Sequence, residues 1–162
     1  MNGCVIPGSF DPVTRGHVDL IRRAARLFDR VTVVIMVNIR KQGHFPLERR
    51  AAMLRAACAD IPGVRVETWQ GLLSGYMAQS GEKAVVRGVR SAAEYDAEMT
   101  AAQANRMLYP EMETLLLPAG EGMQWISSSA VREIAAFGGD IRNFVPEPCA
   151  EEIVRGLSNQ KQ

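Results

Sequence analysis

Apolar and polar positions along this chain follow two alternating patterns, one typical of buried strands and one typical of amphipathic helices. Short, mainly apolar runs occupy residues 3–7, 31–37, 84–86 and 114–117, and apolar and polar residues alternate over 64–69. Between them, apolar residues recur at three- and four-residue spacing, as in Val18, Ile21, Ala25 and Phe28, or in Leu47, Ala51, Leu54 and Cys58. Runs of the first kind favour strands, and the spacing of the second kind favours helices.

The pattern therefore predicts five strands separated by helices. We expect helices over about 16–28, from 47 to the break at 61–63, over 72–79, 92–108 and 127–137, and a last one from about 148. The chain contains no internal repeat and no long linker. It is predicted to form one α/β domain over residues 1–162, with a doubly wound, five-stranded parallel sheet.

Composition narrows the class of protein. No apolar run approaches the ~20 residues that cross a bilayer, and no basic start precedes an apolar signal core, so we expect a cytoplasmic protein. A formal net charge of +1 disfavours a general nucleic-acid binder. Cys4, Cys58 and Cys149 have no metal-like spacing, and Cys4 and Cys58 are expected to be buried thiols in a reducing compartment. No metal site built from protein ligands alone is predicted.

The stretch from Gly8 to His17 carries the strongest chemical signal. It follows the first strand and leads into a helix, so unpaired N–H groups at the positive end of the helix dipole are expected there. A phosphate fits such a junction. Ser9 and His17 add a hydroxyl and an imidazole. A glycine-bearing turn alone is weak support, because many turns use glycine and a lone histidine can be a simple cap.

A second hydroxyl-rich helix start lies at Ser127-Ser128-Ser129. One serine would suffice as an N-cap, so the other two are available for a further phosphate contact. Lys41, Leu73, Arg87 and Arg90 also follow predicted strands. The carboxyl ends of parallel strands meet at one edge, which predicts a single crevice for all these residues. Arg87 and Arg90 are expected to share an anion. Arg22, Arg23 and Arg26 are interpreted as a solvated helix face.

Two motifs carry a family resemblance. Gly8-Ser9-Phe10-Asp11-Pro12, leading into Thr14-Arg15-Gly16-His17, resembles the first signature of the nucleotidyltransferase superfamily, and the run from Ile126 to Arg132 resembles its second. Lys41, Leu47-Glu48-x-Arg50, Arg87-Gly88-Val89-Arg90, Glu98-Met99 and Asn105-Arg106 extend the resemblance over most of the chain, to the bacterial phosphopantetheine adenylyltransferase family. That resemblance implies a Rossmann-like nucleotidyltransferase fold and adenylyl transfer from ATP to 4′-phosphopantetheine.

The resemblance also implies roles for individual residues. Three residues are expected to be catalytic: His17, which stabilises the transition state, and also Lys41 and Arg90. The acceptor phosphate and its pantetheine arm are expected at Ser9, Lys41, Leu73 and Arg87. ATP is expected at Ser9, Phe10, His17, Gly88, Val89, Arg90, Glu98, Met123, Gln124, Trp125, Ile126, Ser127, Ser128 and Ser129. Feedback inhibition by coenzyme A and a homohexamer are likewise implied.

The chemistry of such a reaction agrees with these residue types. A phosphate oxygen is already anionic at neutral pH, so catalysis needs alignment and charge stabilisation rather than a base. Mg²⁺ is expected to arrive on the ATP phosphates. Ala97 and Met123 stand where many relatives carry aromatic residues, which affects the adenine pocket. Trp69 and Trp125 are interpreted mainly as packing residues.

Three alternatives stay open at this point. A relative with another acceptor, such as a nicotinate-nucleotide adenylyltransferase or a glycerol-phosphate cytidylyltransferase, is disfavoured by Lys41 and by the segment 87–90. A non-catalytic nucleotide sensor would use the same crevice without turnover. A redox or flavin protein on a similar sheet would be coloured.

Overall fold

The fold is built on a parallel sheet of five strands in a computed structural model that describes residues 2–40 and 42–158. The strands are β1 (Gly3–Gly8), β2 (Arg30–Val37), β3 (Val64–Gln70), β4 (Ala84–Val89) and β5 (Glu113–Pro118). Their order across the sheet is β3-β2-β1-β4-β5, and every neighbouring pair is parallel. The chain therefore builds one half of the sheet outward from β1, then crosses back and builds the other half from β4.

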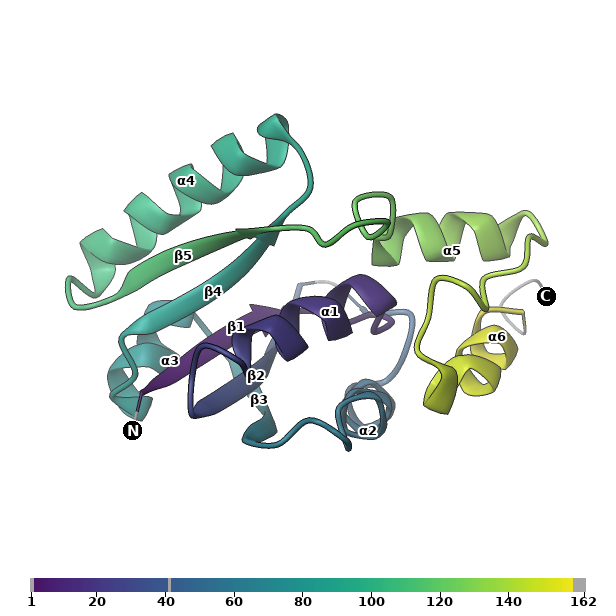
Figure 1. The fold of residues 1–162 in the computed structure, drawn as a ribbon, viewed down its shortest axis with the longest axis horizontal. Helices are drawn as coiled ribbons and strands as arrows, with labels where there is room; N and C mark the ends of the chain where they lie inside the picture. The colour runs from purple at the N-terminus through teal and green to yellow at the C-terminus, as the bar shows by residue number, and fades with distance from the viewer. Residues whose placement is uncertain (1, 41, 159–162) are drawn as a thin grey trace.

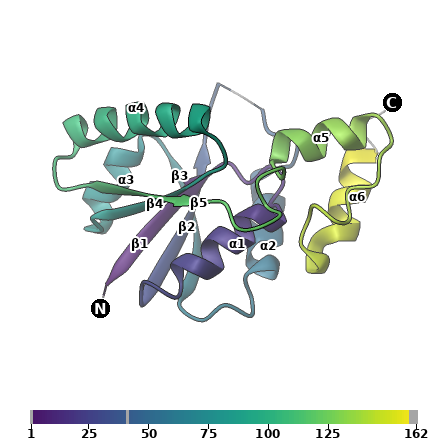
Figure 2. The same ribbon diagram turned by 45° about the horizontal axis from the view of Figure 1, so that its top comes forward.

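Helices cover both faces of this sheet (Figure 1). The covering helices are α1 (Arg15–Ala24), α2 (Leu47–Ala57), α3 (Leu73–Ser80) and α4 (Ala92–Leu108), whereas α5 (Ser128–Ala136) and α6 (Ala150–Ser158) lie together beyond one end of the sheet. Figure 2 shows α3 and α4 above the sheet and α1 and α2 beneath it. The strand pleat explains this division, because alternate side chains point to opposite faces. Cys4 and Ile6 enter the larger core with α1 and α2, whereas Val5 enters the smaller core with α3.

The predicted fold class is confirmed, and most predicted elements lie where the sequence placed them. The prediction for α4 matches both of its observed ends. Several boundaries differ, and α2 ends at Ala57, before the predicted break at 61–63. Helix α1 ends at Ala24 rather than near Phe28, and α6 begins at Ala150 after a single 3₁₀ turn, Glu147–Cys149. Strand β4 continues to Val89, because Arg87, Gly88 and Val89 pair with β5.

Strands β1 and β4 separate halfway along their length, and this separation creates the site. Their register includes only Cys4 with Ala84 and Val5 with Val85. On their outer sides both strands stay paired for their whole length, β1 with β2 and β4 with β5. The gap opens toward the carboxyl ends of the strands, at the point where strand order reverses. Ligands of doubly wound sheets bind at this position.

All three cysteines are buried, as predicted for Cys4 and Cys58, and Cys149 is buried as well. Burial in apolar surroundings raises the pKa of the Cys4 thiol to about 12, and that of Cys58 and of Cys149 to about 11. Because the thiolate is the reactive form, we expect none of the three to react with an aromatic disulfide reagent at pH 8 in the folded protein. All three should react in denaturant. Fast labelling of one thiol under native conditions would contradict this.

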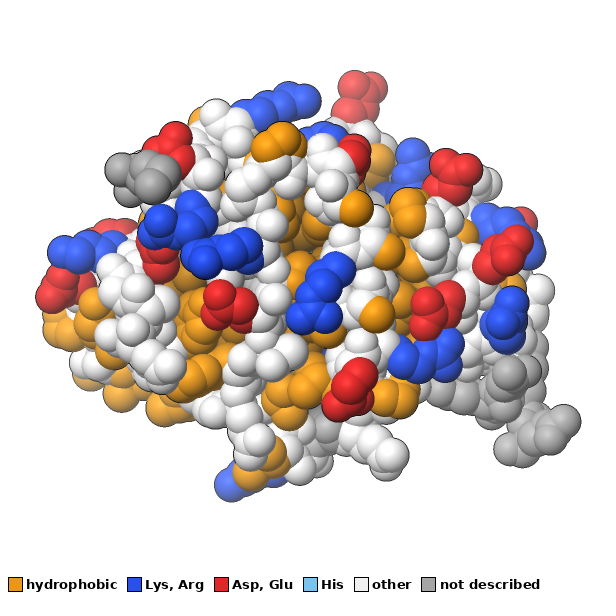
Figure 3. All heavy atoms as spheres, turned by 90° about the horizontal axis from the view of Figure 1, so that it is seen from below, with side chains coloured by type: hydrophobic (Ala, Val, Ile, Leu, Met, Phe, Trp, Pro, Cys, Tyr) orange, Lys and Arg blue, Asp and Glu red, His pale blue; other side chains and the backbone are white. Residues whose placement is uncertain are grey.

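The surface has mixed charge. On the face shown in Figure 3, basic and acidic side chains are interspersed, with no broad area of one sign. Within the described residues, no helix is both long and apolar enough to span a membrane.

Candidate active site

A cavity of about 410 Å³ occupies the gap between β1 and β4. Its walls come from the turn after β1, the start of α1, the end of β4, helix α4, the loop after β5 and the start of α5. It is lined by most of the residues that the sequence singled out: Ser9, Phe10, His17, Arg87, Gly88, Val89, Arg90, Glu98, Met123, Ile126, Ser127, Ser128 and Ser129. The prediction of one shared crevice is confirmed for these positions.

The turn after β1 is held in an unusual backbone conformation. Phe10 has a φ of 46°, in the left-handed region that non-glycine residues rarely adopt, and its side chain is buried. The carboxylate of Asp11 accepts hydrogen bonds from the N–H groups of His44 (2.7 Å) and Phe45 (2.9 Å). These bonds tie the loop before α2 to the turn. Lys41, predicted to bind the acceptor phosphate, belongs to this loop but lies outside the described residues.

His17 is oriented by the start of its own helix. Thr14 caps α1, and its backbone N–H donates to Nδ1 of His17 (3.0 Å). An accepting Nδ1 places the proton of the neutral ring on Nε2. The ring also packs edge-on against Phe10, with 4.9 Å between the centroids. His17 is therefore both an N-terminal cap and a donor on the cavity wall.

The His17 imidazole is neutral at physiological pH. Burial, and to a smaller extent the positive charges of Arg90 and Arg87, together lower its pKa from 6.5 to about 4. A neutral ring can donate through Nε2–H but adds no net charge to the site. This arrangement suits a group that hydrogen-bonds to developing negative charge.

The depressed pKa of His17 predicts a specific dependence of stability on pH. The unfolded ring titrates near 6.5 and the folded ring near 4, so the unfolded state binds more protons between these values. Stability should therefore fall as pH decreases from 6.5 to 4. A His17→Gln variant should lose part of this slope in urea unfolding followed at each pH. A His17 ring that titrates near 6.5 by NMR in the folded protein would contradict the account.

The two arginines of the segment 87–90 are each paired with a glutamate of α4. Arg87 donates to both carboxylate oxygens of Glu98 (2.8 and 2.6 Å) and also to the carbonyl of Pro7 (2.6 Å). It thus bridges the gap between β4 and β1. Arg90 pairs with Glu94, whose pKa is lowered chiefly by that hydrogen bond. The sequence identified Glu98 but not Glu94.

The start of α5 packs against the turn that follows β1. Ser127 accepts from the N–H of Ala130 (3.0 Å) and is the N-cap. The Ser128 hydroxyl donates to the carbonyl of Pro12 (2.7 Å), and Arg132 donates to the carbonyl of Asp11 (2.6 Å). Two helix N-termini, those of α1 and α5, therefore meet at one cavity. Their combined partial positive charge favours a polyanion.

A second cavity of about 390 Å³ adjoins the first. Leu73 and Met36 line it, and it shares Ser9, Arg87 and Glu98 with the larger cavity. Leu73 therefore lies in a neighbouring chamber rather than in the main one. The shared wall places the Arg87–Glu98 pair between the two spaces.

Some sequence-based assignments differ from the structure. Gln124 and Trp125 line neither of these cavities, and Trp125 is 77% exposed, so its interpretation as a packing residue is wrong. Arg23, interpreted as solvated, lines the larger cavity and donates to the carbonyl of Pro118 (2.6 Å). The helical spacing of Gly16, Leu20 and Arg23 was the signal that could have placed it there.

Comparisons with known proteins agree with this geometry. The cytidylyltransferase-like family model matches residues 5–134, which places the chain among nucleotidyltransferases. A Vibrio parahaemolyticus protein assigned as a nicotinate-nucleotide adenylyltransferase shares the fold, with a TM-score of 0.69 at 17% identity over 99% of this chain and 98% of that one.

Curated relatives identify the branch within this class. Phosphopantetheine adenylyltransferase of Thiobacillus denitrificans is 50% identical over 87% of this chain and 88% of its own. That of Rubrobacter xylanophilus is 44% identical over 94% of this chain and 93% of its own. The chain belongs to the phosphopantetheine adenylyltransferase family.

Proposed function

We propose that this protein transfers the adenylyl group of ATP to 4′-phosphopantetheine, giving dephospho-coenzyme A and pyrophosphate, in coenzyme A biosynthesis. The observation that carries this proposal is the convergence of two helix N-termini, a neutral histidine and two arginines on one cavity. Family membership gives the acceptor, because the relatives at 44–50% identity are named for it.

The proposed reaction is a direct displacement at phosphorus. An oxygen of the acceptor phosphate forms a bond to the α-phosphorus, while the bond from that phosphorus to the β-phosphate bridge oxygen breaks and pyrophosphate leaves. His17 donates from Nε2–H to the α-phosphate as its charge grows. Arg90 and the N–H groups at the start of α5 hold the departing phosphates.

The two adjoining cavities give the two substrates separate places. ATP occupies the larger cavity, along the residues predicted to bind it, and the pantetheine arm lies in the smaller cavity beside Leu73. Arg87 and Ser9, which line both, are proposed to hold the acceptor phosphate at the junction. Lys41 is proposed to join them from the loop before α2.

We expect Mg²⁺ to be held by the ATP phosphates. The cavity carboxylates fit this arrangement, because Glu94 and Glu98 are engaged by arginines and Asp19 lies 3.5 Å from Arg23. Among the described residues, no group of three or more metal-ligating side chains is present. When bound, the ion neutralises charge on the triphosphate.

Product analysis tests the proposed reaction. The protein incubated with ATP, Mg²⁺ and 4′-phosphopantetheine should form dephospho-coenzyme A and pyrophosphate in equal amounts, as followed by chromatography. Nicotinate mononucleotide or glycerol phosphate with CTP should give no turnover. Turnover with either of these and none with phosphopantetheine would overturn the acceptor assignment.

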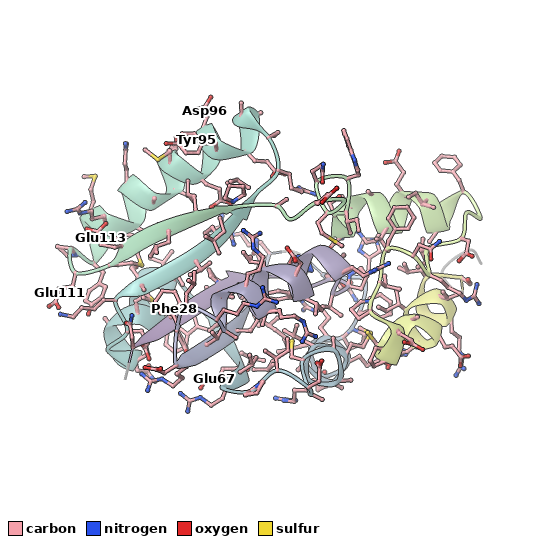
Figure 4. All side chains as sticks on the ribbon, in the orientation of Figure 1. Phe28, Glu67, Tyr95, Asp96, Glu111 and Glu113 are labelled. Carbon is pink, nitrogen blue, oxygen red and sulfur yellow. The ribbon has the colours of Figure 1, made fainter. Side chains whose placement is uncertain are left out.

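Self-association and feedback control are also proposed. Helix α4 has no fully buried residue, and Tyr95, Met99, Met107 and Leu108 on it are exposed, as is Leu115 of β5. Tyr95 and Asp96 lie on α4 at the outer edge of the molecule (Figure 4). This apolar surface supports self-association. The family resemblance supplies the proposed number of subunits, a homohexamer, which light scattering would test. Coenzyme A is proposed as a feedback inhibitor that competes at the same site, and the cytoplasm as the compartment.

A further inference from the structure

Arg50, in the first turn of α2, is the most anomalous charged residue in the structure. It is 8% exposed, and its Nε atom is buried without a hydrogen-bond partner. Among the described residues, no carboxylate forms a salt bridge with it, whereas its exposed neighbour Arg49 pairs with Glu152. A buried cation without an ion pair is costly.

The position of Arg50 in its helix adds to this cost. A positive side chain near a helix N-terminus faces the positive end of the dipole. Pro46, the residue before α2, supplies no side-chain cap that would offset it. Asp11 lies nearby, since a Cβ on Gly43 would be 3.1 Å from Asp11 Oδ2 and 3.4 Å from Arg50 Cζ. Its carboxylate, however, accepts from the N–H groups of His44 and Phe45.

Within the described residues, the Arg50 side chain forms one hydrogen bond, and this bond connects it to the active site. Its Nη1 donates to the carbonyl of Ser9 (2.9 Å). Ser9 lines both cavities, whereas Arg50 lines neither. The guanidinium therefore lies behind the turn, and the Ser9 carbonyl points away from the substrate spaces.

This bond fixes the direction of the next N–H group. The Ser9–Phe10 peptide is trans, so the carbonyl of Ser9 and the N–H of Phe10 point in opposite directions. With the carbonyl held by Arg50, the N–H faces the cavity that Phe10 lines. No group in the described part of the chain accepts a hydrogen bond from this N–H. It is a donor left for a ligand, next to the Ser9 hydroxyl.

We propose that Arg50 is a positioning residue of the phosphate site: its buried guanidinium, which forms no salt bridge with any described residue, holds the Ser9–Phe10 peptide so that the Phe10 N–H faces the substrates, and its positive charge attracts them. The proposal rests on the proposed function, because it takes phosphate groups as the ligand. Among the described residues no carboxylate forms a salt bridge with Arg50, and phosphate supplies further negative charge beside Asp11. Burying Arg50 therefore lowers the stability of the folded protein and serves ligand binding.

The test compares Arg50→Met with Arg50→Lys and with Arg55→Met, which changes an exposed arginine of the same helix. Pyrophosphate binding is measured by calorimetry, alongside kcat, KM and thermal unfolding. Arg50→Met should weaken pyrophosphate binding at least about tenfold and raise the KM of both substrates, yet unfold at or above the parent temperature. Arg50→Lys keeps the charge and a donor, so its affinity for pyrophosphate should stay within about threefold of that of the parent. Arg55→Met should bind pyrophosphate as tightly as the parent.

Three results would overturn the proposal. One is Arg50→Met binding pyrophosphate within about twofold of the parent. A second is Arg50→Met unfolding well below the parent, since the arginine would then serve stability. The third is a folded Arg50→Lys variant that loses as much affinity as Arg50→Met. If the parent protein binds pyrophosphate but does not form dephospho-coenzyme A, the proposed reaction is wrong, whereas the proposed role of Arg50 in phosphate binding still stands.

Discussion

Replacing His17 by alanine is expected to lower kcat by at least about 10²-fold, with a modest effect on ATP binding. The reason is that Nε2–H contributes most when negative charge grows on the α-phosphate, and a single such donor is worth about 3 kcal/mol. The measurement is steady-state turnover of ATP and phosphopantetheine, with ATP affinity determined separately by calorimetry.

The control for this change must separate catalysis from helix capping. Nδ1 of His17 accepts from the N–H of Thr14, so alanine also removes a cap and should lower stability by roughly 1 kcal/mol. His17→Gln keeps an amide donor and should recover part of the rate. Unchanged turnover in His17→Ala would remove this residue from the mechanism.

The second large effect is expected for Arg87→Ala. This change removes an acceptor-phosphate contact and also leaves Glu98, which is 19% exposed at its side chain, without its partner. The freed carboxylate would repel an incoming phosphate. We expect kcat/KM for phosphopantetheine to fall on the order of 10²-fold or more, with a smaller change in the KM of ATP.

A double variant tests the cause of that loss. In Arg87→Ala/Glu98→Ala the repulsion is absent, so about tenfold of the activity should return relative to Arg87→Ala alone. Arg106→Ala is the matched control, because Arg106 pairs with Glu113 at the surface, where both side chains are 62% exposed. It should change neither parameter. A double variant no better than Arg87→Ala would show that Glu98 repulsion does not contribute.

The sequence predicted those parts of the fold that depend on local pattern. The ends of α4 were predictable because Ser91 caps it and Pro110 follows it. The start of α5 was predictable because Ser127 is a capping residue before an apolar repeat. The extent of β4 was not, since Arg87 and Gly88 join the sheet only through their pairing with β5.

The sequence predicted which residues line the site, but it did not predict which of them form hydrogen bonds with one another. Motifs placed Ser9, His17 and the serines of α5 at strand ends. That Arg87 would meet Glu98 depends on how α4 packs over β4. Arg90 and Glu94 are four residues apart, and this local spacing was the signal that could have identified Glu94. The hydrogen bond from Arg50 to Ser9 spans 41 positions and has no periodic signal. Such contacts follow from tertiary structure alone.

The measurement that tests the account most directly is a crystal structure with a non-hydrolysable ATP analogue and Mg²⁺. We predict the triphosphate in the cavity between β1 and β4, with Nε2 of His17 at hydrogen-bond distance from the α-phosphate and the start of α5 against the outer phosphates. A triphosphate bound elsewhere, with the imidazole turned toward solvent, would contradict adenylyl transfer at this site.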